Sequence, residues 1–175
     1  MNIYVSCPLT HVPRNVFDKY TSFIHRLAEG ARLSGQQHVS YALVSSDPQL
    51  AGKPIDERAR LCYLWDRDLV ERADLVIAEV SYPAIGVGIE LQIAESKDIP
   101  IILCFKRSVE TRAASVSYEN PDHTRHTLQI GEGYVSLMAL GLSAIFKVIA
   151  YDREEEAIAN VVEAIRVITK DERRA

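Results

Sequence analysis

Residues 74–105 read DLVIAEVSYPAIGVGIELQIAESKDIPIILCF, and this stretch decides the fold. Its two ends, residues 74–80 and 100–105, are nearly continuous apolar runs, which are typical of strands covered on both faces. Between them, a proline and two glycines lead into a segment that we expect to be a helix from about residue 88 to residue 97. The stretch therefore predicts a strand, a crossover helix and a second, parallel strand.

The same alternation continues in both directions along the chain. Residues 2–6 form a short extended run, and apolar residues then recur along residues 13–33 at the spacing of one helical face. The order predicts a single α/β domain over residues 1–175, with a doubly wound, five-stranded parallel sheet of flavodoxin-like order. The predicted strands are 2–6, 38–44, 74–80, 100–105 and 146–150, and the predicted helices are 13–33, 56–72, 88–97 and 154–168.

Residues 107–143 do not fit this alternation, and we interpret them as an insertion or loop region. They combine a polar loop at residues 120–123 with a small apolar stretch at residues 134–144. Loops of this length are more often functional or interfacial than idle. The apolar stretch is expected to be either an interface helix or a satellite helix within the domain.

Composition excludes several classes of protein. The formal net charge is −4, and the only dense basic stretch is Arg173-Arg174, so we expect no nucleic-acid polymer as partner. No apolar segment approaches the roughly 20 residues needed to cross a bilayer, so we expect a cytoplasmic protein without a membrane partner. The three cysteines, Cys7, Cys62 and Cys104, lie far apart and are expected to be free thiols.

The candidate reactive residue follows the third predicted strand. Ligands of doubly wound sheets bind beyond the carboxyl ends of the strands, here residues 4–10 and 79–90. Gly86 and Gly88 are expected to allow a tight turn and a close approach to a ligand. Glu90 is then expected in the first helical turn, where free N–H groups would keep a nucleophilic carboxylate ionised for attack on a sugar carbon. A glutamate that merely stabilises a first turn is the other interpretation.

The second predicted helix carries a carboxylate on its apolar stripe. Asp66 continues the series Ile55, Ala59 and Cys62, and a carboxylate on a buried face is costly unless it is paired or used. A structural, paired aspartate and a site residue both fit this position. Trp65 beside it fits the core or a wall on which a base stacks, and Tyr4 fits the core or the site.

Several other site motifs do not fit. The glycines are not a dinucleotide fingerprint, because Leu91 stands where the third glycine belongs. There is no Walker-type loop and no Gly-x-Ser-x-Gly elbow. His123 and His126 have no third ligand nearby, so we expect no metal, and Cys7 has no histidine spaced as its base.

Taken together, these segments resemble the nucleoside 2-deoxyribosyltransferase family, above all its branch of 2'-deoxynucleoside 5'-phosphate N-hydrolases. The resemblance rests on a central block of about 40 residues and on two short segments outside it; the segments are 66–80, 83–91 and 101–105, with 3–5 and 151–152. It implies a flavodoxin-like, nucleoside deoxyribosyltransferase-like fold and a homodimer or higher homo-oligomer in which each site borrows residues from its neighbour.

The resemblance also implies roles for individual residues. The family's nucleophilic glutamate falls on Glu90, and its helical aspartate, which handles the proton of the leaving base, falls on Asp66. The family's first-strand tyrosine, which helps to hold the glutamate, falls on Tyr4. The serine donated across the dimer falls on Ser115 after a shift of one residue. The candidate substrate-binding residues are Ser6, Pro8, Ala84, Gly86, Gly88 and Ser115.

Two departures from the family concern the substrate. Ala84 stands where the nucleotide hydrolases carry a serine that helps to bind the 5'-phosphate. Their first loop has a serine and an arginine followed by glycines, whereas residues 6–11 here read SCPLTH, with Arg14 as a candidate substitute. Both a free nucleoside and a 5'-monophosphate are therefore expected as substrate candidates.

Three functions follow as hypotheses. The first is cleavage of the N-glycosidic bond of a nucleoside or its 5'-monophosphate through a glycosyl-Glu90 intermediate, which is then discharged to water by a hydrolase or to a second base by a transferase. Carboxylates alone stabilise the transition state, so no metal or organic cofactor is expected. The second is a non-catalytic nucleotide-binding or sensing domain with the same fold. The third is an unrelated flavodoxin-like module, such as a flavin carrier or a signalling receiver.

Overall fold

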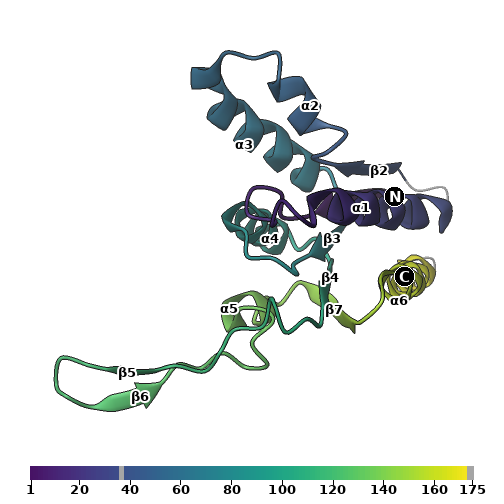
Figure 1. The fold of residues 1–175 in the computed structure, drawn as a ribbon. Helices are drawn as coiled ribbons and strands as arrows, with labels where there is room; N and C mark the ends of the chain where they lie inside the picture. The colour runs from purple at the N-terminus through teal and green to yellow at the C-terminus, as the bar shows by residue number, and fades with distance from the viewer. Residues whose placement is uncertain (36–37, 173–175) are drawn as a thin grey trace.

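A five-stranded parallel sheet forms the centre of the computed structural model, which describes residues 1–35 and 38–172 (Figure 1). The strands lie in the order β2-β1-β3-β4-β7, and the predicted flavodoxin-like fold class is confirmed. The strands of the sheet are β1 (Asn2–Ser6), β2 (His38–Tyr41), β3 (Leu75–Glu79), β4 (Ile101–Lys106) and β7 (Ile145–Tyr151). The helices around it are α1 (Phe17–Leu33), α2 (Ser46–Leu50), α3 (Ile55–Glu71), α4 (Ile85–Ser96) and α6 (Glu154–Glu172).

Two apolar layers cover the two faces of the sheet. Helices α1 and α6 lie on one face, and α4 with the end of α3 lies on the other (Figure 1). Side chains of a strand alternate between faces, so Ile3 and Val5 of β1 pack towards α1 and α6, whereas Tyr4 packs towards α4. The continuous apolar runs of β3 and β4 follow from this arrangement, because both of their faces are buried.

Four predicted boundaries were wrong, and one of them is the end of α6, which lies at Glu172 and not at Ile168. Helix α4 begins at Ile85, not at Gly88, because Ala84 is already the extended residue that precedes the helix. Helix α1 begins at Phe17, since residues 13–16 form a turn. Strand β2 ends at Tyr41, and the segment after it contains the short helix α2, which the sequence pattern did not predict.

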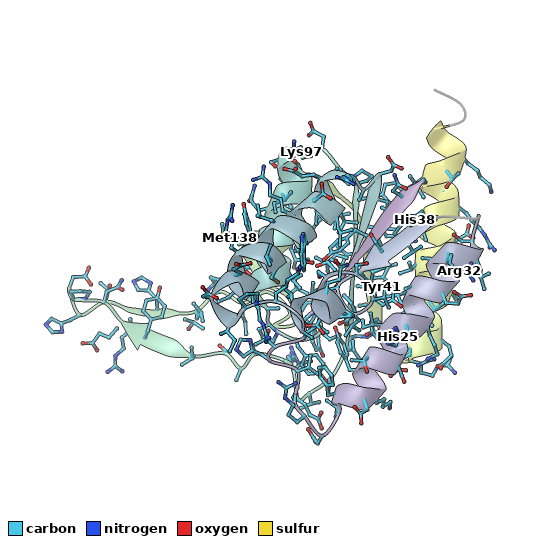
Figure 2. The ribbon with its side chains drawn as sticks, turned by 90° about the horizontal axis from the view of Figure 1, so that it is seen from above. His25, Arg32, His38, Tyr41, Lys97 and Met138 are labelled. Carbon is cyan, nitrogen blue, oxygen red and sulfur yellow. The ribbon has the colours of Figure 1, made fainter. Side chains whose placement is uncertain are left out.

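Residues 107–143 contain a hairpin and a short helix. The hairpin consists of β5 (Ser117–Glu119) and β6 (Arg125–Thr127), whose residues are all exposed, and it extends away from the sheet (Figure 1). Helix α5 (Leu137–Leu140) is only four residues long, and Tyr134 before it stacks on Phe105 of β4 with ring centroids 5.5 Å apart. Met138 of α5 is exposed and lies on the opposite side of the molecule from Arg32 of α1 (Figure 2).

The three cysteines are free thiols, as predicted: Cys104 is buried, and Cys7 and Cys62 are partly buried. In residues 1–35 and 38–172, no helix has both the length and the apolar character needed to span a bilayer.

Candidate active site

The carboxylate of Glu90 lies between α4 and the end of β1, where two hydroxyl groups hold it. Tyr4 Oη donates a hydrogen bond to Glu90 Oε1 at 2.9 Å, and Ser6 Oγ donates to Glu90 Oε2. Tyr4 and Ser6 are both buried and are two positions apart on β1, so they emerge on the same face of the sheet. The predicted proximity of Tyr4 to Glu90 is therefore present in the structure, and Ser6 contacts the carboxylate itself.

Glu90 does not lie in the first turn of its helix, and this prediction was wrong. It is the sixth residue of α4, beyond the four N–H groups that lack partners within a helix. Gly86 and Gly88 lie in the helix and not in a tight turn; neither has a positive φ, and an added Cβ would meet nothing within 4 Å. Hydroxyl groups, and not the end of the helix, hold the carboxylate in place.

Burial changes the proton affinity of this site. It raises the pKa of Glu90 to about 7, although the hydrogen bonds from Ser6 and Tyr4 act in the opposite direction. The negative charge of Asp66 is a further cause of the raised pKa of Glu90. Burial also raises the pKa of Tyr4 well above its ordinary range, so Tyr4 acts as a neutral donor. Near neutral pH, both the protonated and the ionised form of Glu90 are therefore populated.

Asp66 lies on α3, on the same side of the sheet. Its Oδ1 accepts a hydrogen bond from Ser46 Oγ, and Cys62 Sγ donates to its Oδ2 at 3.3 Å. Ser46 is buried and belongs to the unpredicted helix α2, which therefore supplies a group that orients Asp66. Burial and the charge of Asp66 raise the pKa of Cys62 to about 11, so this thiol is a neutral partner.

The other predicted residues make no hydrogen bond to the Glu90 carboxylate among the residues that the structure describes. Pro8 is buried in the loop after β1. Trp65 is half-buried on α3. Ser115 is exposed in the segment before β5, where the hairpin leaves the body of the molecule. Arg14 is exposed, and its guanidinium lies over the ring of Phe17 at 5.2 Å.

A large apolar cavity of about 1010 Å³ lies on another side of α4. Its wall on this helix includes Ala84, Val87, Gly88 and Leu91, which are three or four residues apart and form one helical face. At 100° per residue, Glu90 points roughly opposite to Gly88. Ala84 and Gly88 therefore line a cavity from which the carboxylate points away. The far wall comes from the loops around the hairpin and from α5, including Leu128, Tyr134 and Met138.

A second buried carboxylate, which the sequence interpretation did not single out, is Glu79 at the end of β3. It is 0% exposed and accepts hydrogen bonds from Tyr20 Oη at 2.6 Å and from Tyr151 Oη at 2.9 Å. The sequence signal was a charged residue within an otherwise apolar strand. Burial raises the pKa of Glu79, and its hydrogen bonds oppose that rise.

The fold and the Tyr4–Ser6–Glu90 contacts define a flavodoxin-like α/β protein with a held carboxylate at the carboxyl edge of its sheet. No family model matches the chain. Two curated relatives, from Syntrophotalea carbinolica and Thermofilum pendens, share the name "Putative 2'-deoxynucleoside 5'-phosphate N-hydrolase 1". These names confirm the predicted resemblance to 2'-deoxynucleoside 5'-phosphate N-hydrolases.

The similarity to these relatives differs in extent. The first is 39% identical over 62 residues, which cover 35% of this chain and only 44% of the relative. The second is 26% identical over 124 residues, which cover 69% of this chain and 81% of the relative.

Two solved structures share the fold. The CMP N-glycosidase of Clostridium botulinum has a TM-score of 0.55 and 17% identity, over 92% of this chain and 97% of its own. A conserved protein from Enterococcus faecalis V583 has a TM-score of 0.55 and 18% identity, over 94% of this chain and 96% of its own.

Proposed function

We propose that this protein cleaves the N-glycosidic bond of a nucleoside or of a nucleoside 5'-monophosphate, with Glu90 as nucleophile. The observation that carries the proposal is the carboxylate of Glu90, held by the hydroxyl groups of Tyr4 and Ser6 at the carboxyl edge of the sheet. The names of the two curated relatives, which describe N-hydrolases of 2'-deoxynucleoside 5'-phosphates, support the same reaction class.

The proposed reaction has two steps. Ionised Glu90 attacks the anomeric carbon, the bond to the base nitrogen breaks, and the base leaves with the bonding electrons and a proton from Asp66. Water or a second base then attacks the glycosyl ester, passes a proton to Asp66 and releases Glu90. Tyr4 and Ser6 hold the carboxylate in the geometry of attack.

Release of free base tests this proposal. The purified chain is incubated with ribo- and deoxyribonucleosides and their 5'-monophosphates, with and without an acceptor base, and the products are separated by chromatography. Exchange of one base for another identifies a transferase, and release without an acceptor identifies a hydrolase. Glu90→Gln should abolish turnover, whereas Arg32→Gln, at an exposed residue in the last turn of α1, should retain it (Figure 2).

The covalent intermediate needs its own test. Acid-quenched samples of the working enzyme should contain a chain whose mass is increased by one dehydrated sugar, on the peptide that contains Glu90. Turnover that continues at the parental rate in Glu90→Gln would rule out this mechanism.

We further propose a homodimer in which the partner contributes Ser115. Ser115 is exposed at the base of the hairpin and is free to reach another chain. Light scattering coupled to size exclusion measures the mass in solution, and a strict monomer would remove both the dimer and this role of Ser115.

A binding domain without turnover is the second candidate, and Ala84 favours it. The residue before α4 has no hydroxyl with which to hold a 5'-phosphate. Nucleosides that raise the melting temperature while no base is released would support this alternative, because a ligand that binds only the native state stabilises it.

A further inference from the structure

Glu79 is a carboxylate enclosed completely at the carboxyl end of the central strand β3. In addition to the hydroxyl groups of Tyr20 and Tyr151, it accepts the backbone N–H of Ser81 at 3.2 Å and the hydroxyl of the same serine. Burying a carboxylate is costly even with good partners, and apolar residues of similar size often stabilise a core as well or better. Stability alone therefore does not explain this group.

The partners of Glu79 come from three separate parts of the chain, and one of them, Ser81, also contacts a fourth. Tyr20 comes from α1, Tyr151 from the end of β7, and Ser81 from the turn after β3. Ser81 Oγ also accepts the backbone N–H of Lys106, the last residue of β4, at 2.7 Å. The ring of Tyr20 meets the ring of Tyr82 edge to face, with centroids 5.4 Å apart. The turn at residues 80–84 is thus held by the carboxylate of Glu79, by the backbone of Lys106 and by the ring of Tyr20.

This turn leads directly into the helix that carries Glu90. Ala84 precedes α4, and Glu90 lies in the second turn of this helix. A helix of 12 residues moves largely as one body, so a shift at its start moves Glu90. The hydroxyl groups that receive Glu90 belong to β1, which pairs directly with β3. The sheet places the hydroxyls, and the turn places the carboxylate.

We infer that Glu79 is a positioning residue: through Ser81 it fixes the start of α4, and so holds Glu90 against Tyr4 and Ser6. The expected effect of Glu79 on turnover rests on the proposed function. The claim that Glu79 positions Glu90 holds whether or not the protein has that function.

Ser81→Ala is the sharpest test, because it removes the hydroxyl that joins the turn to Glu79 and to the backbone of Lys106 without changing any charge; the backbone N–H of residue 81 remains. Ser143→Ala is its matched control: Ser143 also donates both its backbone N–H and its hydroxyl to one carboxylate, that of Glu95 at the other end of α4. The titration of the Glu90 carboxyl carbon is followed by NMR, with Glu90→Gln to assign the signal. The kcat and KM for base release are measured in parallel.

Ser81→Ala should move the Glu90 titration midpoint by at least about half a pH unit, since the bonds to Tyr4 and Ser6 change. It should lower kcat at least about tenfold while KM changes little, because misplaced reacting groups slow the chemical step. Ser81→Thr, which keeps the hydroxyl, should have the parental titration midpoint of Glu90 and the parental kcat. Ser143→Ala should leave both unchanged. If Ser81→Ala does not fold, Glu79→Gln replaces it and should change kcat and the midpoint in the same way.

A lower melting temperature with an unchanged Glu90 midpoint and unchanged kcat would overturn the inference and leave Glu79 a structural residue. Failure of the proposed function has a different signature. In that case the parental chain releases no base from any nucleoside, and the Glu90 midpoint in Ser81→Ala still decides whether Glu79 positions the carboxylate.

Discussion

At the scale of single residues, burial and two hydroxyl groups act on Glu90 in opposite directions. Burial favours the protonated carboxyl group, whereas the hydrogen bonds from Tyr4 and Ser6 favour the carboxylate. The outcome is a pKa of about 7, compared with an ordinary value of 4.5. A carboxylate that is partly desolvated in this way is a stronger nucleophile than one in water, and its ionisation weakens the fold.

Glu90→Gln is therefore expected to be more stable than the parental chain above neutral pH. The folded state holds the Glu90 proton more tightly than the unfolded state does, so ionisation costs stability between pH 4.5 and about 7. The full cost above pH 7 is up to ~3 kcal/mol, and it is absent below pH 4.5. Urea unfolding of both proteins at pH 4 and pH 8 measures the difference, and an equal stability gap at both pH values would contradict the raised pKa.

Ser6→Ala is expected to shift the pH dependence of turnover upward. The hydroxyl of Ser6 lowers the pKa of Glu90, so its removal raises that pKa and moves the rising limb of kcat/KM to higher pH. The parental limb should lie near pH 7 because the nucleophile must be ionised. A pH–rate series for both proteins checks this, and a downward shift would show that Ser6 does not stabilise the carboxylate.

Some of these residues could be predicted from the sequence, and others could not. The resemblance placed Glu90, Tyr4 and Asp66 in one site, and the structure brings Tyr4 into contact with Glu90. Ser46 was not predicted as a partner of Asp66, because a hydroxyl group finds its partner only through the tertiary fold. Ser6 was predicted to bind substrate, and its hydrogen bond to Glu90 is a contact that the sequence did not predict.

At the scale of elements, hydrophobic periodicity and composition predicted each strand of the sheet and the four long helices. They did not predict the residues at which several of these elements begin or end. Gly86 and Gly88 suggested a turn, because glycine has low helix propensity. In the structure, tertiary packing of Val87 and Leu91 holds this segment as helix. The short elements α2, β5 and β6 escaped prediction because each has too few residues to show a period.

Two glycine substitutions should have opposite effects. Gly30 lies in α1, where an added Cβ would be 2.7 Å from Ile158 Cγ2 of α6, so Gly30→Ala should destabilise the chain by about 1–3 kcal/mol. At Gly88 an added Cβ meets nothing, so Gly88→Ala should stabilise the chain by about 0.4–1 kcal/mol. Urea denaturation measures both, and a stabilising Gly30→Ala would mean that α1 and α6 do not pack this closely.

At the scale of the whole molecule, the core belongs to the sheet and its helices, and the hairpin is separate from it. None of residues 117–127 is buried. The two ends of the hairpin meet, since Leu128 N donates to Val116 O at 2.9 Å. The fold of the body could be predicted because its alternation of strands and helices is regular, whereas the course of the hairpin depends on turns of weak sequence signal.

Replacing residues 117–127 by a two-residue Asn-Gly turn should leave the body folded. The segment contributes no core side chain, so the melting temperature should change by less than about 3 °C. Thermal melting followed by circular dichroism measures this change. Loss of a cooperative transition would show that the hairpin supports the sheet.

The enclosed phenols of Tyr4, Tyr20 and Tyr151 have a practical consequence. These three of the eight tyrosines donate to carboxylates, and burial raises the pKa of each above the ordinary value of 10. When the pH is raised and the absorbance of ionised tyrosine is followed, these three residues should contribute no phenolate absorbance while the chain is folded. They should ionise together when the chain unfolds. The phenolate absorbance of a purified variant at high pH therefore reports, without a label, whether the carboxyl end of its sheet is still folded.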